Sequence, residues 1–340
     1  MHLQYIVSNQ TEPYWNIAVE NYLVDCLNVS FPDCLSTCAS NTHAIKQSSN
    51  ETIALYLWRN RRTVVIGQNQ NPYSEVNVEA LEGDGGYLMR RKTGGGAVYH
   101  DDCNINFSFV VPKALYDQPR QFAVIQRAVE SFGLHTELSG RNDILAEGRK
   151  FSGNAFSKGR ANDLHHGTIL IGGNMDDLQR YLRPKPAKLQ KHGVSSVRSR
   201  VVNLSELNPA ITSESLTPRL RDAFEAEYGG KSVEVGFIDL ISRPEVKALH
   251  DHFASAEWKY GNWRTFTAQR SGQYDWGGVE VSLDIKEGVI SDVQIASDAL
   301  DLAAVSTAAD LLRGASTTER LQPTGNRTID DILSLVLDMN

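Results

Sequence analysis

Three consecutive glycines, Gly94 to Gly96, lie inside the stretch RRKTGGGAVYHDDCNIN, which runs from Arg90 to Asn106. A backbone segment without side chains can adopt positive φ and can approach a bound molecule to van der Waals distance. The stretch therefore predicts a loop that can serve as a cradle for a ligand, and the rest of the fold has to be arranged around it.

The flanks of the glycines indicate the kind of ligand. Three cations precede them, Arg90, Arg91 and Lys92, and arginine can hold an oxyanion through two parallel hydrogen bonds. A polar cluster follows, made of His100, Asp101, Asp102 and Asn104. A glycine triplet alone is often only a flexible loop, and this one has neither the closing Lys-Ser or Lys-Thr of a P-loop nor the dinucleotide fingerprint. The flanks favour an anionic small molecule.

Length and composition narrow the class of protein. A chain of 340 residues predicts one large domain and a smaller one, and the composition shifts beyond about Pro244. No apolar run is long enough to cross a bilayer, and the first residues resemble neither a secretory signal nor a mitochondrial presequence, so we expect a cytoplasmic location. The net charge of -7 disfavours a general nucleic-acid binder, and the basic clusters near Arg59 and Arg90 fit a specific small anion better.

The four cysteines are Cys26, Cys34, Cys38 and Cys103. They form no CxxC pair and no zinc-site spacing, and a chain of this size needs no disulfides, so we expect reduced thiols. Cys103 lies inside the central stretch, where two interpretations compete. It is either a nucleophile that carries an acyl group or a small buried side chain, and the second is favoured.

Hydrophobic periodicity predicts the secondary structure of the first half. Apolar residues recur at helical spacing over 15–27 and 122–132, and Gly133 ends the second of these helices. The polar stretch 28–51 predicts a surface loop or insertion. Apolar or alternating runs predict strands, at 52–58, 63–67, 87–89, 97–99 and 105–111. We expect the first two strands to form a hairpin and the last two to pair.

The second half contains a predicted hairpin with an unusual lysine. A strand from Asn142 to Ala146 turns at Glu147 and Gly148 and returns through Lys150, which places this lysine opposite Asn142 and Asp143. Further elements follow, namely a strand at 169–171 after His165 and His166, a mobile basic loop at 180–200, a helix at 216–228, and beyond about 244 a strand pair with two helices.

Lys150 is the candidate for chemistry. An ammonium on a long stem can contact a carboxylate and a phosphate together, which suits adenylation of an acid by ATP. Asp143 in the same cavity could hold Mg²⁺ at phosphate oxygens. The alternatives are an exposed strand lysine and an aspartate that caps local backbone.

Three histidines, His100, His165 and His166, raise the question of a metal site or a base. Their spacing fits no standard metal pattern, so hydrogen bonding within the site is the favoured interpretation.

Five motifs occur in order along the chain, RRKTGGGAVYHDDCN, GRNDI, GRKFSGNA, HHGTIL and GVSSVRSRV. With them, the sequence resembles the lipoate-protein ligase A family over almost its whole length. The resemblance implies an α+β protein with two parts. Residues 1–245 would form a catalytic domain related to biotin protein ligases, with mixed sheets and packed helices, and residues 246–340 a small α+β accessory domain.

The resemblance also implies a reaction. Members of the family make lipoyl-AMP from lipoate and ATP, with Mg²⁺, and then pass the lipoyl group to a lysine. The acceptors are apo-lipoyl domains of 2-oxoacid dehydrogenases and the glycine cleavage H protein. We expect no nucleic-acid or membrane partner.

The resemblance further implies a set of site residues, which are carried over by matching positions and are expectations for this chain. The lysine that contacts both the lipoate carboxylate and the phosphate is Lys150. The lipoate contacts are Ile17, Arg91, Thr93, Gly94, Gly95, Gly96, Asn104, Lys150 and His166. The ATP contacts are Arg91, Gly96, Ala97, Val98, Tyr99, Asn142, Asp143, Lys150, Ser152 and Ala155, with Asp143 on the Mg²⁺ side. Residues 172–200 would correspond to the adenylate-binding loop, which in this family moves between the two half-reactions.

The sequence departs from the family pattern at several positions. Cys103 replaces the usual glycine of HDxGN, Lys92 and Thr93 stand where serines are common, and Ser157 replaces an arginine that Lys158 could substitute. Three alternatives stay open. The chain could be a lipoyltransferase that uses preformed lipoyl-AMP, an octanoyltransferase, or a regulator that binds lipoate or a nucleotide without catalysis. The basic stretch 180–200 would suit an acidic acceptor domain.

Overall fold

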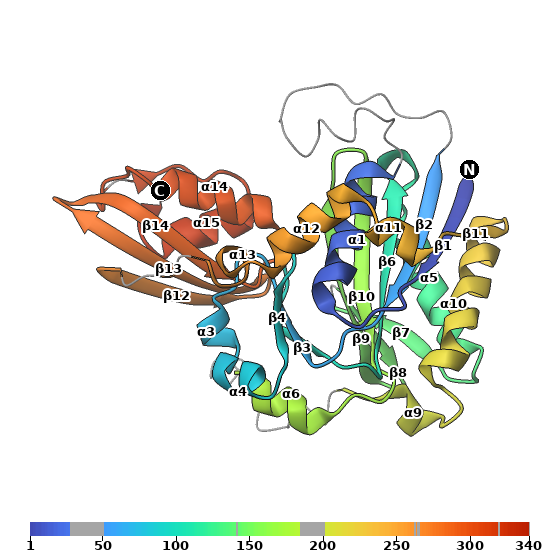
Figure 1. Cartoon of the computed structure of the whole chain (residues 1–340). Helices are drawn as coiled ribbons and strands as arrows, with labels where there is room; N and C mark the ends of the chain where they lie inside the picture. Colours follow the sequence, from blue (N-terminus) through green and yellow to red (C-terminus); the bar gives the residue numbers. More distant parts are fainter. Residues whose placement is uncertain are drawn as a thin grey trace.

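Eight strands form one large mixed sheet at the centre of the computed structural model, which describes residues 1–27, 51–140, 142–183, 201–261, 263, 266–318 and 320–339 (Figure 1). The strand order is β11-β1-β2-β6-β10-β9-β8-β7. The strand bounds are β1 His2–Val7, β2 Thr52–Trp58, β6 Ile105–Pro112, β7 Thr136–Ser139, β8 Asp143–Ala146, β9 Arg149–Lys158, β10 Asn162–Ile169 and β11 Ser232–Glu234. Strands β11, β1 and β2 run parallel, and the remaining pairings are antiparallel.

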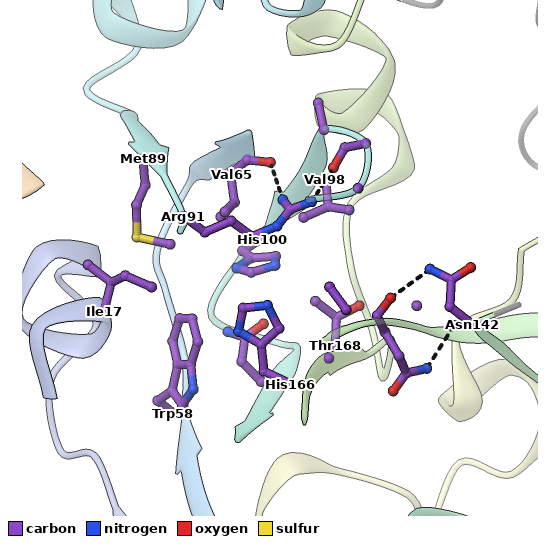
Figure 2. Close-up of a pocket in the computed structure, with 18 of the residues that line it drawn as sticks. Ile17, Trp58, Val65, Met89, Arg91, Val98, His100, Asn142, His166 and Thr168 are labelled. Carbon is purple, nitrogen blue, oxygen red and sulfur yellow. Dashed lines mark hydrogen bonds between the residues drawn. The ribbon is translucent and has the colours of Figure 1, made fainter. Parts of the chain in front are cut away.

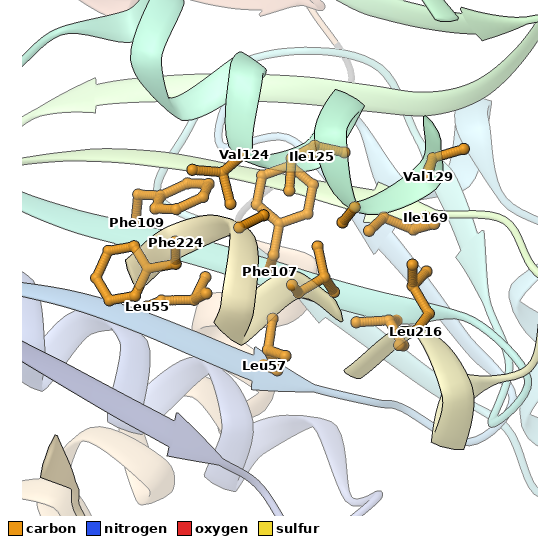
Figure 3. Packing of buried hydrophobic residues seen from close by; sticks show 14 of the residues in the cluster. Leu55, Leu57, Phe107, Phe109, Val124, Ile125, Val129, Ile169, Leu216 and Phe224 are labelled. Atoms are coloured by element: carbon orange, nitrogen blue, oxygen red, sulfur yellow. The ribbon is translucent and has the colours of Figure 1, made fainter. Parts of the chain in front are cut away.

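One face of this sheet is covered by two helices, α5 (Gln118–Glu130) and α10 (Ser213–Tyr228). Because side chains alternate along a strand, every second residue points to this face. Leu55, Leu57, Phe107 and Phe109 of β2 and β6 do so, and they pack against the helices in the largest core (Figure 3). The short helix α9 (Leu204–Leu207) also contributes to this core.

The opposite face packs on α1 (Pro13–Cys26), α11 (Phe237–Ile241) and α12 (Pro244–Ala254). Glu12 caps the start of α1 by accepting a hydrogen bond from the amide of Trp15, and Pro13 occupies its first turn. A second sheet lies next to this face, with the order β4-β3-β5 and the bounds β3 Thr63–Ile66, β4 Tyr87–Arg90 and β5 Val98–His100. The site lies between these two sheets.

Four short helices surround the small sheet, α3 (Pro72–Glu75), α4 (Val78–Gly83), α6 (Met175–Tyr181) and α13 (Ala256–Tyr260). A separate lobe follows, with a three-stranded sheet of β12 (Ala268–Tyr274), β13 (Gly277–Lys286) and β14 (Val289–Ser297). Helices α14 (Leu302–Leu312) and α15 (Arg327–Ser334) pack on it, with the short strands β15 (Arg320–Leu321) and β16 (Asp338–Met339). The α+β class is confirmed, while the division at residue 245 stays a prediction.

Two predicted strand pairings are wrong. Strands β2 and β3 do not form a hairpin, because β2 pairs with β1 and β6 while β3 pairs with β4 and β5 of the other sheet. Strand β6 likewise pairs with β2 and β10 rather than with β5. Both errors assumed that neighbours in sequence pair, whereas the chain crosses between sheets at each of these loops. The 142–150 hairpin is confirmed, with Glu147 and Gly148 both at positive φ in its turn.

Two sequence predictions fall outside the described residues, the loop at 28–50 and most of the basic loop at 180–200. The expectation of reduced cysteines is wrong for Cys26, which is disulfide-bonded. A chain of this size needs no disulfide, but that does not exclude one.

The predicted strand at 169–171, after the two histidines, is also wrong. His165 and His166 lie inside strand β10, which ends at Ile169. None of the helices that the structure describes is long and apolar enough to cross a membrane.

Candidate active site

A cavity of about 320 Å³ lies between the large and small sheets, beside α1 (Figure 2). Its wall combines apolar side chains from both sheets with a polar end near β8 and β9. The lining residues are Ile17, Trp58, Val65, Met89, Arg91, Gly95, Gly96, Ala97, Val98, His100, Asn106, Asn142, Lys150, Gly153, Asn154, Ala155, His166, Gly167 and Thr168. Such a cavity suits a ligand with an apolar tail and a polar head.

The polar end is built by the β8–β9 hairpin. The Lys150 ammonium lies 2.7 Å from Oδ1 of Asp143, and about a third of each side chain is exposed. Gly153 leaves room for this lysine, because a Cβ there would lie 3.1 Å from Nζ. Asn142 and Asn154 form two reciprocal hydrogen bonds beside this lysine. The side-chain amide of Asn142 donates to the backbone carbonyl oxygen of Asn154 (2.6 Å), and the side-chain amide of Asn154 donates to that of Asn142 (2.9 Å).

Arg91 organises the glycine loop. Its buried guanidinium donates to the carbonyl oxygens of Gly94 (2.8 Å), Gly96 (2.9 Å) and Val65 (3.2 Å). Burial lowers the pKa of Arg91 to about 10, so the side chain remains a cation at neutral pH. The loop therefore folds around a positive charge that also lines the cavity.

A chain of hydrogen bonds links this arginine to a carboxylate on α1. Nε of Arg91 donates to Oγ1 of Thr93 (3.0 Å), which lies 2.9 Å from Nε2 of His166. Nδ1 of His166 lies 2.8 Å from Oε2 of Glu20, a side chain only 1% exposed. If Nδ1 carries the imidazole proton, every donor in the chain meets an acceptor. Buried cation and buried carboxylate are thus joined through the loop threonine.

The C-terminal lobe contacts the glycine loop directly. The amide of Gly95 donates to the carbonyl oxygen of Ala299 (3.4 Å). A Cβ on Gly94 would lie 2.1 Å from that same oxygen, and Gly95 has a φ of +95°. Glycine at these two positions is required by a close approach and by a left-handed conformation.

The structure brings together most of the predicted site residues. Ten of them line the cavity, and six do not, namely Thr93, Gly94, Tyr99, Asn104, Asp143 and Ser152. Thr93, Gly94 and Asp143 contact the lining as described above. Oδ1 of the buried Asn104 accepts from the amide of Ile171 (3.1 Å), and Ser152 is a fully buried residue of β9.

Tyr99 and Cys103 face a different cavity, which they share with Asp101, Asp102 and Asp177. The Tyr99 hydroxyl donates to Asp177 (3.2 Å). The Cys103 side chain is exposed, so the favoured expectation of a small buried residue is wrong: the segment 101–104 turns at the surface. Partial burial and the carboxylates of Asp101 and Asp102 raise the pKa of this thiol, which disfavours the reactive thiolate.

Sequence reasoning missed several residues of the cavity wall and the glutamate behind it. Glu20, Trp58 and Met89 come from elements predicted only as core helix or strand, and alternation along β6 places Asn106 and Ser108 on the same face as Trp58. A glutamate at the centre of the predicted core helix, directly after Val19, was the signal that the sequence offered for this side of the site.

The fold is that of lipoate ligases. The LipL1 structure of P. falciparum, in complex with lipoate, superimposes with a TM-score of 0.81 and 29% identity, covering 98% of each chain. A bipartite lipoate protein ligase from Thermoplasma acidophilum, solved with its E2 lipoyl domain, gives a TM-score of 0.61 at 22% identity, covering 79% of this chain and all of that one. A lipoate-protein ligase A bound with ATP gives 0.58 at 22%, covering 77% and 99%.

Sequence comparisons agree with these structural matches. Residues 12–225 match the family described as lipoyl protein ligase A/B catalytic domain, and residues 264–321 match the bacterial lipoate protein ligase C-terminus. The lipoate-protein ligase A of Psychrobacter cryohalolentis is 37% identical over 309 residues, which cover 89% of this chain and 85% of that protein. The chain therefore belongs to the lipoyl protein ligase A/B family, and the prediction of an enzyme that ligates lipoate is confirmed. The relation to biotin protein ligases stays a prediction.

Proposed function

We propose that this enzyme is an ATP-dependent lipoate-protein ligase that catalyses two steps. It first converts lipoate and ATP to lipoyl-AMP and pyrophosphate, and it then transfers the lipoyl group to a lysine of an apo-lipoyl domain. The observation that carries the proposal is the position of Lys150, whose ammonium lies at the polar end of a mainly apolar cavity next to the glycine loop.

The cavity matches the shape of the acid. Lipoate has one carboxylate and a long apolar tail, so its binding site needs a cation at one end and apolar side chains along the rest of its wall. Lys150, which contacts Asp143 next to Asn142, supplies the first. Ile17, Trp58 and Met89 supply the second, and Figure 2 shows them at the end away from Asn142. In this orientation the carboxylate lies beside the bare backbone of Gly95 and Gly96, where a nucleotide phosphate can approach closely.

In the first step a carboxylate oxygen attacks the α-phosphorus of ATP. The new C–O–P bond forms as the bond to the β-phosphate breaks, and pyrophosphate leaves with the electron pair. Negative charge grows on the α-phosphate oxygens, and we assign its stabilisation to the ammonium of Lys150, which lines the same cavity as Gly95 and Gly96. No proton transfer is required, so binding and charge stabilisation account for the chemistry.

Asp143 fits a magnesium ion held mainly by substrate phosphates. One of its oxygens contacts Lys150, and its side chain is 34% exposed, so the second oxygen can take a cation. A single carboxylate suits Mg²⁺, which keeps several waters and binds phosphates. When bound, the ion would neutralise phosphate charge next to the lysine.

In the second step the neutral amine of an acceptor lysine attacks the acyl carbon, the acyl C–O bond breaks so that AMP leaves with the electron pair, and the new amide nitrogen releases a proton. The mixed anhydride is already activated, so the enzyme needs no nucleophile of its own. The exposed Cys103 lies outside the cavity lining, which supports transfer without an acyl-cysteine intermediate. Acceptor domains of 2-oxoacid dehydrogenases and the glycine cleavage H protein are the proposed partners, and the Thermoplasma relative solved with an E2 lipoyl domain supports this class.

The test measures the two steps separately. Pyrophosphate release from ATP is followed with and without lipoate, and an apo-lipoyl domain is then added and weighed by mass spectrometry. Replacing Lys150 with Ala should lower the rate of release about 10²- to 10³-fold, since it removes one preorganised charge at the reacting phosphate. Lys247→Ala, on the exposed side of helix α12 and outside the cavity lining, is the control and should leave the rate unchanged.

Two outcomes separate the proposal from its rivals. Modification of the acceptor from added lipoyl-AMP or an acyl thioester, without any release of pyrophosphate from ATP, would identify a transferase. Binding of lipoate or nucleotide without any acceptor modification would identify a regulator.

A further inference from the structure

Two buried polar residues of the cavity wall have atoms without a hydrogen-bond partner among the described residues. These atoms are Nε2 of His100 and both amide atoms of Asn106. The two residues are 4% and 1% exposed, and both line the cavity. Because burying an unpaired polar atom destabilises a fold, such atoms in a cavity wall indicate a group that serves the ligand.

Hydrogen bonds to the neighbouring side chains fix the proton on His100. Oδ1 of Asn16 accepts from Ser8 (2.7 Å), so its NH₂ faces the Arg59 carbonyl oxygen (2.8 Å) and Oδ1 of Asn60 (3.0 Å). Asn60 therefore turns its own NH₂ to Nδ1 of His100, at 3.3 Å. Nδ1 is the acceptor in this contact.

The unpartnered nitrogen of His100 is consequently a donor. Burial, reinforced by the nearby Arg91 cation, lowers the pKa of His100 to about 3, so the ring is neutral. A neutral imidazole carries one proton, which Asn60 directs to Nε2. Asn106 adds two more N–H donors and one acceptor to the same wall.

These donors lie away from the carboxylate end. The ring of His100 meets the edge of Trp58 at a centroid distance of 6.1 Å, and Asn106 pairs with Trp58 across β2 and β6. Figure 2 shows Trp58 beside Ile17 and Met89, with His100 between them and Asn142 at the other end. A lipoate whose carboxylate meets Lys150 extends its tail toward this apolar end. The two dithiolane sulfurs are the only atoms of that tail that can accept a hydrogen bond.

Building on the proposed function, we propose that His100 and Asn106 donate hydrogen bonds to the dithiolane sulfurs and thereby select lipoate over a plain alkanoic acid. Octanoate has the same chain length and carboxylate but no acceptor on its tail. With octanoate bound, the donors stay unpaired, and a site built to hydrogen-bond one substrate discriminates against an analogue that lacks the partner.

Asn106→Leu is the sharpest test. Its side-chain amide has no hydrogen-bond partner in the part of the chain that the structure describes, so an apolar side chain of similar size removes no hydrogen bond seen there and the variant should fold. We expect the ratio of kcat/KM for lipoate to kcat/KM for octanoate, measured by pyrophosphate release, to fall about three- to tenfold. Asn208→Leu is the control, since it lies outside the cavity lining and loses a bond to the Phe132 carbonyl oxygen. This control should leave the ratio unchanged.

His100→Phe tests the second donor and should shift the ratio in the same direction. A ratio that stays at the wild-type value in both variants, or rises, overturns the inference. Calorimetric binding of the two acids to the wild type, without ATP, keeps this outcome separate from failure of the proposed function. If pyrophosphate release is absent but lipoate still binds more tightly than octanoate, and loses that advantage in Asn106→Leu, only the proposed reaction is wrong.

Discussion

The two faces of the eight-stranded sheet are made from the same strands but have different roles: one forms a hydrophobic core, and the other lines the cavity. Phe107 and His165 point to one face, where rings and aliphatic side chains from α5 and α10 fill the space. Their chain neighbours Asn106 and His166 point to the other face, where the cavity lies. One face is packed for stability, and the other leaves buried polar atoms and open volume for a substrate.

The adjacent histidines sharpen this difference. His165 is surrounded by Phe107, Phe109, Phe122 and Phe156, with ring centroids 4.7–5.8 Å away. His166 instead connects α1 to the glycine loop. The contrast shows that a two-residue motif can carry a structural role and a functional one side by side, because successive side chains of a strand face opposite ways.

The largest effect is expected on the packed face. Phe107→Ala should lower the free energy of unfolding by about 3–5 kcal/mol, since it empties the volume of a fully buried ring. Urea unfolding measures this loss. Because Phe107 points away from the cavity, KM for lipoate in the folded fraction should stay near the wild-type value. A large rise in KM without loss of stability would show that the two faces are not independent.

A pH effect involves both sides of the large sheet, because it has a buried neutral histidine on each side: His165 on the packed face, and His100 of the small sheet across the cavity from the other face. Burial lowers the pKa of His100 to about 3 and that of His165 well below its usual range. The unfolded chain takes up a proton at each below about pH 6.5, while the folded chain does not. The free energy of unfolding should therefore decrease by about 2–3 kcal/mol when the pH is lowered from about 7.5 to about 5.5.

Urea unfolding at the two pH values measures this slope. His165→Gln removes one of the two titrating groups and keeps a hydrogen-bonding side chain, so it should roughly halve the pH dependence. An unchanged slope in the variant would mean that other groups cause it.

The smallest effect is expected on the cavity face. Thr93→Val keeps the side-chain shape but removes the hydroxyl between Arg91 and His166, which leaves the imidazole nitrogen unpaired. We expect KM for lipoate to rise about fivefold, corresponding to about 1 kcal/mol, with little change in unfolding free energy. Thr93→Ser retains the hydroxyl and should restore the wild-type KM. If Ser and Val behave alike, the hydrogen-bond chain does not position the loop.

Local features of the site were predictable from the sequence because their causes are local. The turn at Glu147 and Gly148 follows from two successive positive φ angles, and it brings Lys150 next to Asp143 as expected. The glycine loop and its cations were equally visible. The sheet partners of β3, β5 and β6 were not, because pairing between distant strands depends on which core each strand completes.

The sequence by itself determined the helices at 15–27, 122–132 and 216–228, the hairpin at 142–150, and the position of the glycine loop, and it singled out Lys150. Hydrophobic periodicity, turn residues and glycine conformations depend on residues that are close in sequence, so the sequence alone is enough to predict them. Only the tertiary structure decided that Glu20 meets His166 across 146 positions, that Ala299 closes on Gly94, and that His100 and Asn106 share a wall. These contacts depend on how the two sheets and the C-terminal lobe pack against one another. That packing involves residues far apart in the sequence, so no short segment predicts it.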